Sequence, residues 1–122
     1  MTKEEHREEE LLKKWRAQLS RGILEFLVLI LLQKERYGWD ILQLVRSLLP
    51  PADPPLADGT IYNILTRLKE RSLVTTRNEM FEGRTRKYFM LSEKGKVLLS
   101  EMLKDWKEVL ISISEIEEIS KD

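Results

Sequence analysis

The stretch DGTIYNILTRLKERSLVTTRNEMFEGRTRKYFMLSEKG, residues 58–95, decides the fold. Its first part, residues 59–71, predicts a helix for which Asp58 offers the N-cap, because apolar side chains recur there at helical spacing. The apolar side chains on this face are Ile61, Ile64, Leu65 and Leu68. Small or polar residues occupy the opposite side. We therefore expect a helix with one face in the core and one polar face outward.

A β-hairpin is expected directly after this helix. Residues 73–81 and 86–91 are rich in β-prone side chains, and the connector 82–85 between them contains Gly83. A glycine in a short connector between two such runs is typical of a hairpin. Residues 60–91 hold seven basic side chains against three acidic ones, so positive charge is concentrated in the helix and the hairpin.

A polar-faced helix followed by a basic hairpin is the order of a winged helix-turn-helix. Such a helix enters the major groove with small or polar side chains, while cations on the hairpin, or wing, meet phosphates. The predicted DNA-binding residues are Gly59, Thr60, Tyr62, Asn63, Thr66, Arg67, Arg77, Arg84, Arg86 and Lys87. The alternative for each is an ordinary solvated surface.

Three helices are expected before residue 50. Residues 3–19 form an exposed helix with an apolar edge of Leu11, Leu12, Trp15 and Leu19 that docks on something else. Ser20 caps a buried helix that extends through Leu32. After a break at Tyr37-Gly38, the third helix has a core face of Ile41, Leu42, Leu44, Val45 and Leu48. It ends before Pro50, and residues 50–55 form an exposed connector without helix or central strand.

A long helix capped by Ser92 is predicted at the end of the sequence, with Gly95 as a mild cost to its stability. Its apolar positions follow spacings of 3 and 4, which is a heptad pattern typical of a helix that pairs with another helix. These dimerisation residues are Leu99, Met102, Trp106, Val109, Ile113 and Ile116. Trp106 is open to two interpretations, a packing residue or the wall of a cavity between subunits.

Composition excludes several classes of protein. The 122 residues carry no net charge, no cysteine and one histidine, so disulfides, thiolate chemistry and a zinc site are not expected. No metal or cofactor is predicted. The longest apolar run, residues 23–32, is too short to cross a bilayer, and no signal peptide is visible. We expect a cytoplasmic protein that is not an enzyme, because no catalytic constellation is present.

Residues 20–91 resemble the PadR family of transcriptional regulators. The resemblance depends on five pieces in order, which are Gly22-Ile-Leu-Glu25, Tyr37-Gly-x-x-Ile41, Gly59-Thr-Ile-Tyr62, Gly83-Arg-x-Arg-Lys-Tyr88 and Leu91-Ser-x-x-Gly95. It implies a homodimer, usually a repressor, that binds a two-fold symmetric operator and is held together by the C-terminal helix. Some relatives bind flat aromatic compounds at an equivalent tryptophan, so Trp106 is a candidate effector-binding residue. Many relatives have proline where this chain has Asn63, so the operator sequence does not carry over.

The sequence thus predicts a mainly α protein with a small β-hairpin. It divides into an accessory helix (1–19), a winged helix-turn-helix domain (20–91) and a C-terminal dimerisation helix (92–122). The predicted function is that of a homodimeric transcriptional repressor that binds double-stranded DNA. A small aromatic effector would release it from its operator. A winged-helix module for protein assembly, without sequence-specific DNA binding, is the alternative, and the neutral net charge favours it.

Overall fold

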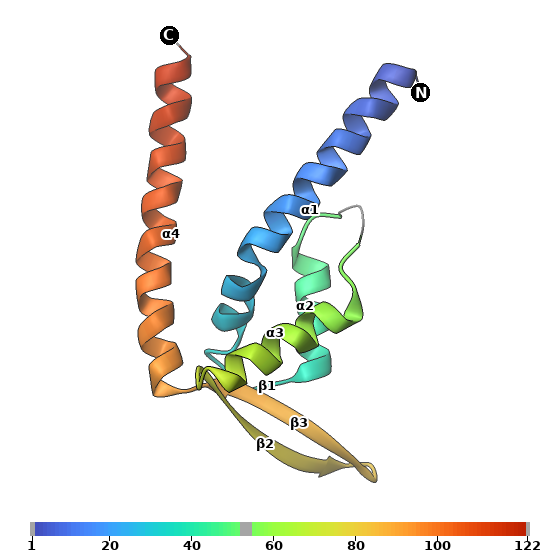
Figure 1. Ribbon diagram of the computed structural model, residues 1–122, viewed down its shortest axis with the longest axis vertical. Helices are drawn as coiled ribbons and strands as arrows, with labels where there is room; N and C mark the ends of the chain where they lie inside the picture. Colours follow the sequence, from blue (N-terminus) through green and yellow to red (C-terminus); the bar gives the residue numbers. More distant parts are fainter. Residues whose placement is uncertain (1, 52–54, 122) are drawn as a thin grey trace.

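A computed structural model describes residues 2–51 and 55–121 and shows a mainly helical protein with one small sheet (Figure 1). The chain forms, in order, α1 (Lys3–Leu31), β1 (Arg36–Tyr37), α2 (Gly38–Leu48), α3 (Asp58–Glu70), β2 (Val74–Phe81), β3 (Arg84–Leu91) and α4 (Glu93–Ser120). This confirms the predicted fold class. The division into three domains is not tested by this arrangement and stays a prediction.

The hydrophobic core lies where α1, α2 and α3 meet above the sheet. The predicted core face of α3 is confirmed, since Ile61, Ile64, Leu65 and Leu68 are all buried. Val28 on α1 and Ile41 on α2 are fully buried beside them. The apolar faces of three helices therefore close over one another, and the polar face of α3 stays outside.

The sheet has three antiparallel strands in the order β1-β3-β2. The hairpin is confirmed, but its turn is shorter than predicted, because β3 begins at Arg84, which pairs with Phe81. The two turn residues Glu82 and Gly83 both have positive φ, 51° and 78°. That combination belongs to a tight turn whose twist matches the strands, and it favours glycine. The short β1 was not predicted; Tyr37 lies opposite Tyr88 in its ladder with β3.

The helix boundary predicted at Ser20 is wrong, because α1 continues without a break from Lys3 to Leu31. The cap lies instead at Thr2, whose Oγ1 accepts a hydrogen bond from the Glu5 amide at 3.1 Å, and the Glu5 carboxylate accepts one from the Thr2 amide. Serine and glycine cost a helix interior about 1 kcal/mol or less each. Packing against the rest of the protein outweighs such costs, so the helix extends through them.

Two details of α2 and α3 also differ from expectation. Leu48 is 69% exposed, and its neighbour Leu49 packs against the core in its place. Asp58 is the first residue of α3 and makes no capping bond; its carboxylate pairs with the Arg46 guanidinium. Within the predicted connector, Pro50, Pro51 and Pro55 lie outside helix and strand, whereas residues 52–54 lie outside the described part of the chain.

The last helix begins as predicted, since the Ser92 hydroxyl accepts a hydrogen bond from the Gly95 amide at 3.0 Å. Its N-terminal half packs on α1, where Leu99 is buried and the ring centres of Trp106 and Phe26 are 5.8 Å apart. Its upper half and the N-terminal half of α1 extend from the same side of the body and diverge (Figure 1). Among the described residues, no helix is long and apolar enough to cross a membrane.

Candidate nucleic-acid interface

Helix α3 presents a polar face that is held in place at both ends. At its beginning, Asp58 is paired with Arg46 of α2. At its end, Arg71 reaches Glu25 of α1, with 3.4 Å between Nη1 and Oε1. These two ion pairs connect the two ends of the helix to α2 and to α1. Because such exposed pairs contribute little, it is the buried face of α3 that fixes the orientation of the exposed face between them.

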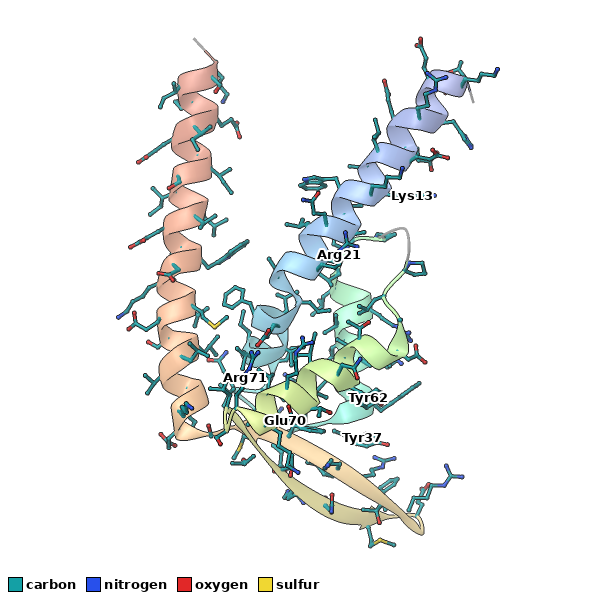
Figure 2. All side chains as sticks on the ribbon, viewed as in Figure 1. Lys13, Arg21, Tyr37, Tyr62, Glu70 and Arg71 are labelled. Atoms are coloured by element: carbon teal, nitrogen blue, oxygen red, sulfur yellow. The ribbon has the colours of Figure 1, made fainter. Side chains whose placement is uncertain are left out.

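The residues predicted on α3 fall into two groups. Most of them are exposed on the outer face or its flanks: Gly59, Tyr62, Asn63, Thr66 and Arg67. Thr60 is half-buried and faces the space between α1 and the connector that precedes α3. Figure 2 shows Tyr62 on the flank toward Tyr37, and Glu70 and Arg71 near the root of the hairpin.

The wing carries two arginines near its tip. Arg84 is exposed beside the turn. The Arg86 guanidinium lies 3.8 Å from the ring centre of Phe81 and 4.7 Å from that of Tyr37. Such cation–π contacts limit the positions that the side chain adopts without neutralising its charge. Arg86 is thus a positioned cation.

Arg77 forms ion pairs with the carboxylates of Glu35 and Glu79. Its Nε and Nη2 bond to Glu35, with distances of 2.9 and 2.8 Å from Nε and 2.6 Å from Nη2, and its Nη1 lies 3.2 Å from Glu79. Its guanidinium lies 4.6 Å from the ring centre of Tyr88. The hydrogen bonds from Arg77 hold the pKa of Glu35 below its ordinary value. Arg77 therefore ties β2 to the segment that follows α1, and its predicted phosphate contact stays a prediction.

The arginine–glutamate tie predicts a pH dependence of stability. Because the pKa of Glu35 is lowered on folding, its contribution to stability is present above about pH 4.5, the ordinary value for glutamate, and is lost as the pH falls through the lowered pKa. We expect Glu35→Gln to lower the melting temperature at neutral pH and to match the native chain in acid. Circular dichroism melts across this range measure it. Glu82→Gln at the exposed turn is the control, and an equal loss in that variant would contradict the assignment.

A groove of about 490 Å³ separates α3 from β3 and the start of α2. Tyr62, Thr66 and Lys69 line it from α3, Lys87 from β3 and Trp39 from α2. Trp39 and Lys69 were missed by the sequence prediction. Lys69 follows Tyr62 by seven residues and so lies on the same flank of the helix, which is a signal that was available. The groove brings Lys69 of the helix and Lys87 of the wing to one place, with Glu70 of α3 beside them.

These features define a class of protein. Three helices, of which the third has an exposed polar face, and a hairpin with cations beside that face make a winged helix-turn-helix.

Residues 27–101 match the family model of the transcriptional regulator PadR-like family. An uncharacterised protein of Lysinibacillus sphaericus is 30% identical over 96 residues, which cover 77% of this chain and 87% of that one. A PadR-like transcription factor from Bacteroides fragilis is 34% identical, with 82% and 95% of the two chains covered and a TM-score of 0.65. A PadR family regulator from Clostridium difficile is 26% identical, with 78% and 98% covered and a TM-score of 0.69. The chain belongs to the PadR-like family and is a DNA-binding transcriptional regulator, not an enzyme.

Proposed function

We propose that this protein is a homodimeric repressor that binds a two-fold symmetric operator. The observation that carries the proposal is the groove in which Tyr62, Thr66 and Lys69 of α3 and Lys87 of the wing converge. Cations beside an exposed polar helix suit a duplex, whose phosphates flank the major groove. Such a regulator acts where the chromosome lies, which in a bacterial cell is the cytoplasm.

Within this proposal the side chains have different tasks. Asn63 and Thr66 are exposed in the middle of the polar face and are assigned to base edges, where an asparagine can bond adenine through both its amide oxygen and its amide nitrogen. Arg84, Arg86 and Lys87 are assigned to phosphates on the wing side. Glu70 also lines the groove between α3 and β3, and it lies at the end of α3 near the root of the hairpin (Figure 2), where the helix would leave the major groove of the DNA.

Dimerisation is supported by two exposed apolar stripes. On α4, Val109, Ile113 and Ile116 are 45%, 53% and 63% exposed and continue the stripe that begins with the buried Leu99. On α1, Trp15 is 56% exposed on the stripe that continues down to Phe26. Large apolar side chains in such a row mark an interaction surface. We assign these stripes to a second copy of the chain, and Leu99 to the core of its own protomer.

A symmetric dimer would present two recognition helices together, about 34 Å apart, to successive major grooves. Trp106 lies half-buried against Phe26, where the two stripes converge. A flat aromatic effector inserted there would change how the two protomers pack and so the separation of their α3 helices. Only a ligand that binds one arrangement better than the other shifts this equilibrium.

The wing predicts the salt dependence of DNA binding. Arg84→Ala with Arg86→Ala is expected to weaken binding to every sequence and to flatten the slope of log affinity against log salt by about 0.9 for each phosphate that the variant no longer neutralises. Fluorescence anisotropy with a labelled duplex measures both effects. Lys3→Ala with Arg7→Ala removes the same charge from the far end of α1 and serves as the control. An unchanged slope in the wing variant would remove the wing from the interface.

The effector site has its own test. Aromatic compounds titrated against the protein are expected to quench tryptophan fluorescence and to release a labelled operator. Trp106→Phe is expected to lose most of the quench while Trp15 and Trp39 remain. An equal quench in that variant would show that the compounds bind elsewhere.

The alternative function, a winged-helix module for protein assembly, is favoured by the zero net charge of the chain. A gel-shift assay on promoter fragments at low salt separates the two proposals. Retarded DNA supports the regulator, and its absence supports assembly. Repression is tested by transcription from the same promoter fragments. Bound protein should lower the yield of transcripts that start within a retarded fragment.

A further inference from the structure

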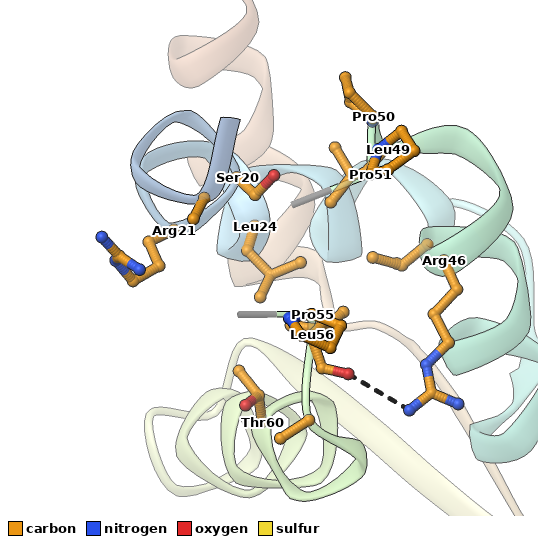
Figure 3. A pocket seen from close by; sticks show the side chains of 13 residues that line it. Ser20, Arg21, Leu24, Arg46, Leu49, Pro50, Pro51, Pro55, Leu56 and Thr60 are labelled. Carbon is orange, nitrogen blue, oxygen red and sulfur yellow. Dashed lines mark hydrogen bonds between the residues drawn. The ribbon is translucent and has the colours of Figure 1, made fainter. Parts of the chain in front are cut away.

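A second pocket lies on the opposite side of α3 from the wing. It has a volume of about 630 Å³ and lies between α1, the end of α2, residues 50–51 and 55–57 of the connector, and the first turn of α3 (Figure 3). Leu24, Val45, Leu49 and Leu56 give it apolar walls, and Thr60 of α3 closes one side. No described residue of α4 lines it, so the pocket is separate from the proposed effector site at Trp106.

The chemistry of the pocket suits an amphipathic anion. Its volume lies within the range of about 300–1,000 Å³ that holds small ligands. Its two charged lining residues among those described, Arg21 and Arg46, are both cations and lie at opposite edges (Figure 3). A guanidinium at the edge of an apolar cavity pairs well with a carboxylate.

The two arginines are not equivalent. The Arg46 guanidinium is already engaged, because it donates to the Leu56 carbonyl at 3.3 Å and pairs with Asp58. Arg21 is exposed and makes no ion pair with any described residue. Its long side chain points outward from the edge in Figure 3 and is able to turn toward a ligand that enters beside it.

We propose that this pocket binds a small monocarboxylate with an apolar body, about the size of octanoate, and that Arg21 holds its carboxylate. The apolar body lies between Leu24 of α1 and Leu56 of the connector. The ligand thereby contacts Thr60 and the first turn of the recognition helix.

The second part of this inference rests on the proposed function. Arg46 ties the end of α2 to Leu56 and Asp58, which sets where α3 begins. DNA favours the position of α3 that fits its major groove. The ligand favours the position of α3 in which the pocket best encloses the apolar part of the ligand. Where these positions differ, the two partners compete. We therefore expect the ligand to lower DNA affinity, which the measurement of DNA binding below tests.

The proposed role of the ligand's carboxylate is tested by comparing the affinities of octanoate and octan-1-ol for the full chain. NMR titration of the backbone amides measures both. We expect octanoate to bind at least about tenfold tighter than the alcohol and to shift the amides of Ser20 and Thr60. Arg21→Gln is expected to bring the two affinities within about threefold of each other. Arg7→Gln, about 21 Å away along α1, is expected to change neither. Equal affinities in the native chain, or shifts confined to Trp106, would overturn the proposal.

The cavity is tested by filling it. Ser20→Trp places an indole among the lining residues, whereas Gln18→Trp places one on an exposed position of the same helix that does not line the pocket. Octanoate affinity is expected to fall at least about tenfold in the first variant and to stay unchanged in the second. Circular dichroism establishes that both are folded. Unchanged binding by a folded Ser20→Trp variant would overturn the site.

The effect on DNA is measured by anisotropy with saturating octanoate, which is expected to weaken binding at least about fivefold in the native chain and not in Arg21→Gln. Octanoate that binds in the pocket while DNA affinity stays the same would overturn the coupling and leave the proposed function standing. A chain that binds octanoate but no duplex at low salt would overturn the proposed function and leave the site standing.

Discussion

Gly95→Ala is expected to destabilise the protein more than alanine at any of its other four glycines. A Cβ at residue 95 would lie 2.1 Å from the carbonyl oxygen of Leu73 and 3.1 Å from Cδ2 of Leu91. The Leu73 oxygen cannot withdraw freely, because it accepts a hydrogen bond from the Ser92 amide at 3.0 Å. The start of α4 would have to move away from the sheet.

Two opposing contributions decide whether Gly95→Ala lowers or raises the stability of the protein. Alanine gains about 1 kcal/mol over glycine in a helix interior. Forcing an atom into a well-packed site costs typically about 1–3 kcal/mol and sometimes more. An approach of 2.1 Å to fixed backbone belongs to the upper end of that range, so a net loss of about 2 kcal/mol or more is expected. In a domain of this size the melting temperature falls by roughly 5–10 °C.

Gly22→Ala is the matched control, because it adds the same methyl group to the interior of α1, where a Cβ meets nothing within 4 Å. We expect this variant to melt slightly higher than the native chain, in keeping with the helix preference for alanine. Thermal unfolding followed by circular dichroism compares the two. If both substitutions shifted the melting temperature in the same direction, the close approach of α4 to Leu73 would be refuted.

Gly95 also illustrates what a sequence conceals. From the sequence it is a small cost to a helix, whereas the structure shows that the cost allows α4 to approach the carbonyl of Leu73, a residue far away in the chain. The periodicity of α3 and the turn at Gly83 are local patterns, and both were predicted. The strand β1 has only two residues and exists because Tyr37 and Arg36 pair with β3. No local pattern encodes such a pairing.

In the candidate interface, too, some features follow from local sequence patterns and others depend on contacts between separate elements. The exposure of Asn63 and Thr66 followed from the apolar period of α3, because the buried face fixes the outer one. The ties of Arg77 to Glu35 did not follow from any spacing, since these residues belong to separate elements. The break expected at Ser20 failed because the helix signal there is weak, and packing of α1 overrides it. The count of charged residues indicated the candidate interface but did not show which cations are already paired.

Replacing Ile113 and Ile116 together with glutamate is expected to leave the fold intact, to abolish the proposed dimer and to weaken operator binding at least about hundredfold. The two side chains are 53% and 63% exposed in one protomer, so the change adds no charge to its core. In the proposed dimer they are covered by the second copy, where unpaired carboxylates are costly. Two linked half-sites bind about 10²–10⁴ times more tightly than one, which sets the size of the loss.

Ile111→Glu provides a sharp control for this experiment. Ile111 is 59% exposed, as much as Ile113, but it lies two residues away and therefore about 200° around the helix from it. A general effect of charge on α4 would also appear in Ile111→Glu, at about half the size for half the added charge, whereas an interface along one stripe affects only the double variant. Analytical ultracentrifugation at micromolar concentration measures the state of each chain, and anisotropy measures its operator affinity. A native chain that sediments as a monomer, or a double variant that sediments as a dimer with full affinity, would refute the proposed interface.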